Sequence, residues 1–155
     1  GSNDRNHDLP GYKWMAQSYN GGQTWSTPKP WTYTDKGAFF SPSATSQLIP
    51  HGNGSLYWMG NISEQNPRGN SPRYPMILGE IDRDTGLLIR DSIAIIDDRQ
   101  PGEHERLTLS NFYVREDRST GDLLLHLPRL FAAGDPQKTQ NAWTTDLTMY
   151  RIGIP

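Results

Sequence analysis

Residues 18–25 read Ser-Tyr-Asn-Gly-Gly-Gln-Thr-Trp, and this stretch indicates a tight β-hairpin turn. The residues Asn20-Gly21-Gly22 suit such a turn, because glycine adopts positive φ angles freely and asparagine tolerates them. Short runs that suit strands flank the turn at residues 13–18 and 31–34. The stretch therefore predicts two antiparallel strands joined by a glycine-rich connection.

Similar turns rich in glycine and proline recur along the chain, and they predict an all-β protein. The 155 residues include 15 Gly and 12 Pro, and few windows show the 3.6-residue period of an amphipathic helix. Further glycine turns are expected at residues 52–54, 84–86 and 119–121, with short apolar runs between them. The expected strands are residues 13–18, 31–34, 43–49, 56–62, 75–81, 88–96, 107–115, 123–127 and 145–152.

Short turns alternate with long polar loops, and this alternation predicts where function lies. The long loops are expected at residues 34–42, 63–73, 97–106 and 128–141. Successive connections of an antiparallel meander lie at opposite ends of its strands. The long, charged loops should therefore gather at one end, and loops on a rigid scaffold commonly carry function.

Composition excludes several classes of protein. Lys and Arg number 15 against 17 Asp and Glu, a net charge of −2, which argues against a nucleic-acid partner. No apolar run approaches the roughly 20 residues of a membrane helix, so no membrane partner is expected. The chain has no cysteine, and its four histidines show no metal-binding spacing, so neither a metal nor another cofactor is expected.

The 18–25 stretch resembles the Asp-box of sialidases and their relatives, Ser-x-Asp-x-Gly-x-x-Trp. Ser18, Gly22 and Trp25 match the motif, and Asn20 stands in place of its Asp. In the motif the acidic side chain accepts turn amides while the Trp packs over the hairpin, and an asparagine carbonyl can also accept. The wider sequence, over roughly residues 12–155, is also similar to bacterial sialidase-like proteins that act on carbohydrate.

The resemblance implies a partial β-propeller of four-stranded antiparallel blades, about two and a half of them in this chain. Residues 13–34 would be half a blade, residues 43–96 a full blade and residues 107–155 a three-stranded blade. Residues 1–12 are expected to be a cloning tag, Gly1-Ser2, followed by a flexible arm. Propellers usually need at least four blades, which predicts a homo-oligomer or a missing N-terminal part. The resemblance also implies a secreted or periplasmic location.

Arginines in the long loops are candidates for binding an anionic sugar. Sialidases hold the substrate carboxylate with an arginine cluster and use a Tyr–Glu pair as nucleophile and base. The resemblance therefore implies that Arg73 and Arg129, with Arg68 nearby, bind substrate and that Tyr74 lies near the chemistry. The alternative interpretation pairs the arginines with loop carboxylates and packs Tyr74 against Pro75.

Residues 97–106 form the densest cluster of titratable side chains. Asp98 and Glu105 are the candidate acid and base, and His104 is a candidate proton shuttle. The alternative is a solvent-exposed loop whose charged side chains form ion pairs with one another.

Aromatic and polar residues elsewhere also leave two interpretations open. Trp14, Trp58 and Trp143 suit either a platform for a sugar ring or the core between sheets. Ser110 and Asn111 are polar at the centre of an expected strand, where they would bond between blades or contact substrate.

The leading hypothesis is that this chain is part of a sialidase-like glycoside hydrolase acting on terminal or acidic sugars, with carbohydrate as its partner. Whether the piece is active alone stays open. A second hypothesis is a non-catalytic glycan-binding or self-assembling propeller fragment. A third is a polysaccharide lyase on a related propeller, in which a His or Tyr removes the C5 proton beside a uronate and Arg neutralises the carboxylate.

Overall fold

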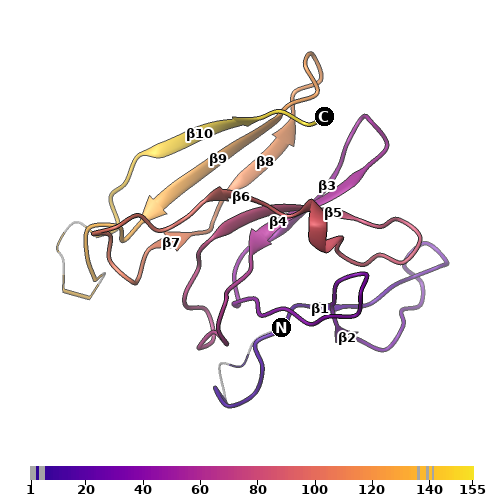
Figure 1. The fold of residues 1–155 in the computed structure, drawn as a ribbon, viewed down its shortest axis with the longest axis horizontal. Coiled ribbons are helices and arrows are strands. Elements are labelled where there is room, and N and C mark those ends of the chain that lie inside the picture. Colours follow the sequence, from indigo (N-terminus) through magenta and orange to yellow (C-terminus); the bar gives the residue numbers. More distant parts are fainter. Residues whose placement is uncertain (1–2, 4–5, 136, 139, 141) are drawn as a thin grey trace.

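Figure 1 shows the fold in a computed structural model, which describes residues 3, 6–135, 137–138, 140 and 142–155. Across these residues the protein is all-β, with one short 3-10 turn, η1 (Arg90–Ser92), and no α-helix. No helical segment there has the length and hydropathy of a membrane span. The strands are β1 (Trp14–Met15), β2 (Lys29–Pro30), β3 (Gln47–Pro50), β4 (Leu56–Asn61), β5 (Met76–Ile81), β6 (Ala94–Asp97), β7 (Thr108–Leu109), β8 (Tyr113–Glu116), β9 (Leu123–Leu130) and β10 (Leu147–Ile152).

The central sheet is the antiparallel meander β3-β4-β5-β6, as expected for residues 43–96. Its last strand differs from the expectation, because residues 88–96 do not form one continuous strand. Instead of pairing throughout, the chain makes η1 and then the shorter β6. The Ser92 hydroxyl replaces the missing ladder partner, since it accepts from Glu80 N at 2.7 Å and donates to Ile89 O at 2.7 Å.

The C-terminal sheet is built around β9, which pairs with β10 on one side and with β7 and β8 on the other. The expected strand at residues 107–115 is split into β7 and β8. Asn111 between them has a φ of 57°, a left-handed conformation that interrupts a β-ladder. The sheet therefore has four strands, where three were expected for residues 107–155.

The N-terminal sheet is smaller than expected, because β1 and β2 are only two residues long. Residues 31–34 form isolated bridges, from Thr32 to Ala38 and from Tyr33 to Leu88, instead of the expected strand. Pro28 and Pro30 lack an N–H to donate, which limits regular pairing here.

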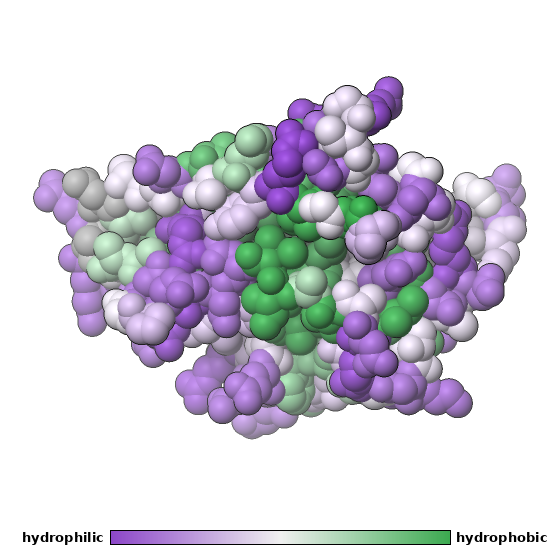
Figure 2. All heavy atoms as spheres, turned by 45° about the horizontal axis from the view of Figure 1, so that its top comes forward, coloured by the Kyte–Doolittle hydropathy of each residue, from purple (hydrophilic) through white to green (hydrophobic). Residues whose placement is uncertain are grey.

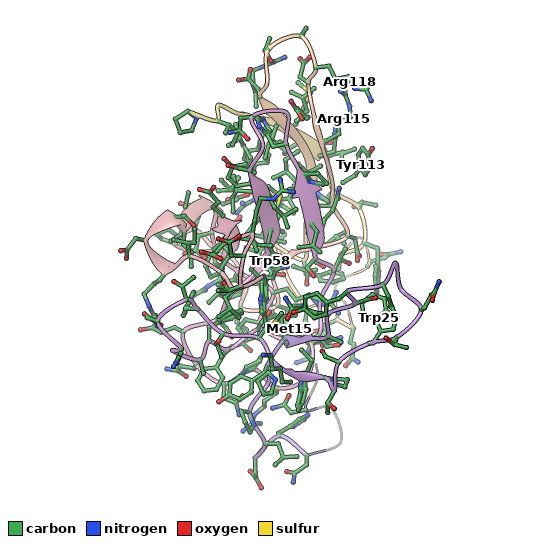
Figure 3. All side chains as sticks on the ribbon, turned by 90° about the vertical axis from the view of Figure 1, so that its right-hand side faces the viewer. Met15, Trp25, Trp58, Tyr113, Arg115 and Arg118 are labelled. Carbon is green, nitrogen blue, oxygen red and sulfur yellow. The ribbon has the colours of Figure 1, made fainter. Side chains whose placement is uncertain are left out.

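Apolar cores lie on both faces of the central sheet. Along β4, Tyr57 and Met59 face the C-terminal sheet, whereas Trp58 faces the N-terminal segment. This alternation follows from the two-residue period of a strand. Trp58 is 3% exposed and meets Trp31 edge-on, with ring centroids 5.2 Å apart. Figure 3 shows Trp58 in the interior near Met15, so Trp58 is a core residue and not a sugar platform.

The short turns meet at one end of the strands, on the right in Figure 1, which confirms the predicted alternation. His51 Nε2 lies 2.6 Å from Gly121 O, and Gly52 N donates to Glu116 at 2.9 Å. The turns at residues 82–86 and 117–121 have the same design. In each, the first Asp accepts from amides of the turn and the closing Gly has a positive φ.

The described N-terminal residues pack against the loop at residues 63–73, whereas a flexible arm was expected. Asn3 Nδ2 donates to Leu9 O at 2.7 Å and to Pro67 O at 2.9 Å, and Gly69 N donates to Asn3 Oδ1 at 2.8 Å. Residues 1–2 lie outside the described residues, so the expected cloning tag stays a prediction.

Strand edges and apolar side chains remain exposed around the C-terminal sheet. β10 is an edge strand, and its Leu147 and Met149 are more than half exposed, as is Ile95 on β6. Figure 2 shows a mostly polar face with apolar side chains gathered near its middle. Such a surface fits association, and the oligomeric state stays a prediction.

Candidate functional site

The long loops at residues 63–75 and 98–106 enclose a hollow of about 940 Å³, called here the loop cleft. It lies at the end of the strands opposite the short turns, where function was predicted. Four residues predicted from the sequence line it, together with two arginines that were not singled out. These six are Arg68, Tyr74, Asp98, Arg99, Glu105 and Arg106.

Asn61 anchors one wall of the loop cleft to the interface between the sheets. This side chain at the end of β4 is fully buried, and its amide nitrogen lies 3.0–3.1 Å from the carbonyl oxygens of Arg73, Pro75 and Leu109. The returning half of the loop is therefore tied both to β4 and to β7. The N-terminal segment supports the same loop from outside, because Asn66 Oδ1 accepts from Gly11 N at 2.8 Å.

Tyr74 places its ring at the boundary between core and cleft. The ring packs against the buried cluster between the central and C-terminal sheets. The Arg99 guanidinium lies 5.5 Å from its centroid, within the range of a cation–π contact. The Tyr74 hydroxyl makes no hydrogen bond to any residue that the structure describes, so it is available to a ligand.

The two candidate carboxylates both line the loop cleft. Asp98 is half-buried, and its Oδ1 accepts from Arg99 N at 2.7 Å, which fixes the side chain at the loop entrance. Glu105 is exposed and makes no hydrogen bond or ion pair within the described part of the chain. The Arg68 side chain is likewise exposed and without such a partner there. The structure therefore brings Arg68, Tyr74, Asp98 and Glu105 together, and their chemical roles stay predictions.

No family model, curated protein or solved structure matches this chain.

Arg129 lies outside the lining of the loop cleft and is held by two carboxylates. Its guanidinium forms a close ion pair with Asp97 and a second one with Glu103 at 2.6 Å. Tyr150 on β10 donates to the same Asp97 carboxylate at 2.6 Å. This arrangement favours the alternative interpretation of Arg129, as a residue that joins β6, β9, β10 and the 98–106 loop.

The ion pairs shift the pKa values of their members. Burial alone would lower the pKa of Arg129, but its hydrogen bonds to Asp97 and Glu103 raise it above the ordinary value. Burial opposes ionisation of Glu103, yet Arg129 and the Gln100 amide lower the pKa of this carboxyl. Burial and the hydrogen bond to Asp97 both raise the pKa of Tyr150. All three groups therefore keep their ordinary charge at neutral pH.

His104 and Arg73 lie beside the loop cleft without lining it. His104 Nδ1 accepts from Arg106 N at 3.1 Å, and its backbone N donates to Ala132 O at 2.9 Å, so it joins two loops. The Arg73 side chain faces a neighbouring hollow. No group of three or more His, Asp or Glu among the described residues is arranged to hold a metal ion.

The Asp-box-like stretch forms a turn closed by its own side chains. Asn20 Oδ1 accepts from Thr24 N at 2.9 Å, and Ser18 Oγ accepts from Gly22 N at 2.8 Å. Trp25 Nε1 donates to Gly22 O at 3.1 Å, so the indole folds over the turn, as predicted. Figure 3 shows Trp25 on a hairpin that projects away from the strands. These residues therefore belong to the fold and not to the loop cleft.

The charged cleft residues that the sequence analysis did not single out are Glu64, Arg99 and Arg106. Arg99 and Arg106 both belong to the 97–106 cluster, where ten residues contain two arginines, four carboxylates and one histidine. Only the folded loop distinguishes members that face the cleft from those, such as Glu103, that are occupied by ion pairs.

Proposed function

We propose that this chain is part of a sialidase-like β-propeller that hydrolyses a glycosidic bond at an acidic or terminal sugar, with the sugar bound in the loop cleft. The observation that carries the proposal is the lining of this cleft. It joins three carboxylates (Glu64, Asp98 and Glu105), a tyrosine hydroxyl without a partner among the described residues, and three guanidinium groups at the end of the strands where the long loops meet.

The fold supports the proposal. Successive antiparallel meanders pack face to face through apolar cores, as blades of a propeller do. The turn at residues 18–25 has the hydrogen bonds and the covering indole that the Asp-box resemblance implies.

The side chains of the cleft suit glycoside hydrolysis. Glycosidases use a pair of carboxyl groups, one to protonate the leaving oxygen and one to act as base or nucleophile. Asp98 and Glu105 are the proposed pair among the three carboxylates of the cleft, and Tyr74 supplies a hydroxyl on a ring whose centroid lies 5.5 Å from the Arg99 guanidinium. The guanidinium groups of Arg68 and Arg106 would bind an anionic group of the sugar or its hydroxyls.

The test is incubation with a panel of sialosides, uronosides and neutral glycosides, with release of free sugar as the readout. The proposal expects release by the wild-type chain and a loss of at least about 100-fold in Asp98→Asn or Glu105→Gln, because general acid–base catalysis contributes that much. Asp91→Asn is the matched control, because this exposed carboxylate on η1 does not line the loop cleft. Unsaturated uronate absorbance without hydrolysis would indicate the lyase alternative, and binding without turnover the non-catalytic one.

A further inference from the structure

A second hollow of about 360 Å³ adjoins the loop cleft, and we call it the aromatic pocket. Its chemistry is set by Arg73, Arg106, Thr108, Phe131 and Trp143. It shares Asn70, Ser71 and Arg106 with the loop cleft, so the two hollows have a common wall. A ligand longer than one sugar ring could therefore occupy both.

Trp143 offers an aromatic surface at this pocket. Its side chain is 70% exposed, which is unusual for so large an apolar group. Phe131 makes an edge-to-face contact with it, with ring centroids 4.8 Å apart and the planes at 90°. Phe131 has a φ of 65°, a conformation that bulky residues rarely adopt. An exposed indole fixed in this way suits stacking on the apolar face of a sugar ring.

Two guanidinium groups give the aromatic pocket a positive charge. Arg73 and Arg106 line it, and among the residues that the structure describes no carboxylate does. The Arg73 backbone is fixed to β7, because its carbonyl accepts from Leu109 N at 3.0 Å. The Arg73 Nε donates to Asn70 O at 2.8 Å, whereas its terminal nitrogens make no hydrogen bond or ion pair within the described residues. A half-buried guanidinium with free donors suits a carboxylate ligand.

We propose that the aromatic pocket binds a negatively charged sugar residue next to the one held in the loop cleft, with its ring on Trp143 and its carboxylate on Arg73. This inference rests on the proposed function of the loop cleft and narrows its substrate to an acidic oligosaccharide of at least two residues. The shared Arg106 lies where the two sugars meet.

The test is a binding titration by calorimetry with matched ligands. Digalacturonate is compared with galactobiose, sialyllactose with lactose, and each disaccharide or trisaccharide with its own monosaccharides. The proposal expects the wild type to bind an acidic oligosaccharide at least about tenfold more tightly than its neutral counterpart and its monosaccharides, the size of one good stacking or charged contact.

Two variants separate the contributions. Arg73→Met should reduce the preference for acidic over neutral oligosaccharides, and Trp143→Ala should remove the gain from the second sugar while the affinity for monosaccharides stays unchanged. Trp143→Phe should restore part of that gain. If monosaccharides bind but neither variant changes how the affinity depends on the length or charge of the ligand, the proposal for the aromatic pocket is wrong. The proposed function of the loop cleft is then retained. If no saccharide of the panel binds the wild type, both proposals are overturned.

Discussion

The guanidinium of Arg129 on β9 binds the carboxylate of Asp97, the last residue of β6. The pair lies between the central and C-terminal sheets, and Glu103 from the next loop completes it. An arginine that the sequence places among substrate ligands therefore links the two sheets that support the loop cleft.

Replacement of Arg129 should destabilise the protein. Arg129→Met leaves Asp97, whose side chain is 9% exposed, without its cation, and we expect a loss of about 2 kcal/mol in the free energy of unfolding. Urea unfolding measures this loss. Arg68→Met, on an exposed arginine that lines the cleft, should leave the unfolding free energy within about 0.5 kcal/mol of the wild type and weaken sugar binding instead. If Arg129→Met weakens sugar binding without lowering the unfolding free energy, Arg129 belongs to the substrate site instead.

The contribution of the Arg129–Glu103 ion pair to the free energy of unfolding should decrease at acid pH. The folded pKa of Glu103 lies below its ordinary value of 4.5, so its contribution is fully present above pH 4.5 and is lost as pH falls through the folded pKa. Glu103→Gln should therefore lower the unfolding free energy by about 1 kcal/mol at pH 7, and the difference from the wild type should shrink as pH falls below 4.5. Urea unfolding at several pH values tests this, and a difference that does not shrink in acid would contradict it.

Asn61 should be the most sensitive polar residue of the core. Asn61→Leu removes the donor for three carbonyl groups at the interface of the sheets, and we expect a loss on the order of 3 kcal/mol in the free energy of unfolding. Ser110→Ala is the control, because the buried Ser110 hydroxyl has no hydrogen-bond partner in the described structure. It should cost less than about 1 kcal/mol, and equal losses in both variants would contradict the role of Asn61.

The turn at residues 18–25 should contribute to stability and not to function. Asn20→Ala removes the acceptor for Thr24 N, and we expect about 1 kcal/mol of destabilisation. Asn20→Asp keeps an acceptor there and should stay near the wild type. Both should bind sugars as the wild type does, since the turn lies away from the loop cleft. A change in sugar affinity, measured by calorimetry, would contradict the assignment.

Much of the fold could be predicted from local sequence signals. Glycine turns such as residues 84–86 and 119–121 require backbone angles that few other residues adopt, so their positions were recognisable. The interruptions within the expected strands were harder to predict. The break at Asn111 and the 3-10 turn at Arg90–Ser92 depend on tertiary partners, and a one-dimensional pattern does not contain them.

The candidate site could be predicted only as a set of loops. Grouping the long loops at one end followed from strand alternation, and this located Arg68, Tyr74, Asp98 and Glu105 correctly in one cleft. Which charged residue is paired with which depends on loop conformation. Arg129 and Arg73 look alike in the sequence, yet one is neutralised by two carboxylates and the other has no ion-pair partner among the described residues.

The most direct test of the central claim is chemical-shift mapping of backbone amides during titration with sialyllactose and digalacturonate. If the sugar binds in the loop cleft and the aromatic pocket, the shifted amides should cluster at residues 63–75 and 98–106 and extend to the region of Trp143, and the turns at residues 18–25, 82–86 and 117–121 should stay unchanged. Shifts confined to those turns, or no shifts with any sugar of the panel, would contradict it.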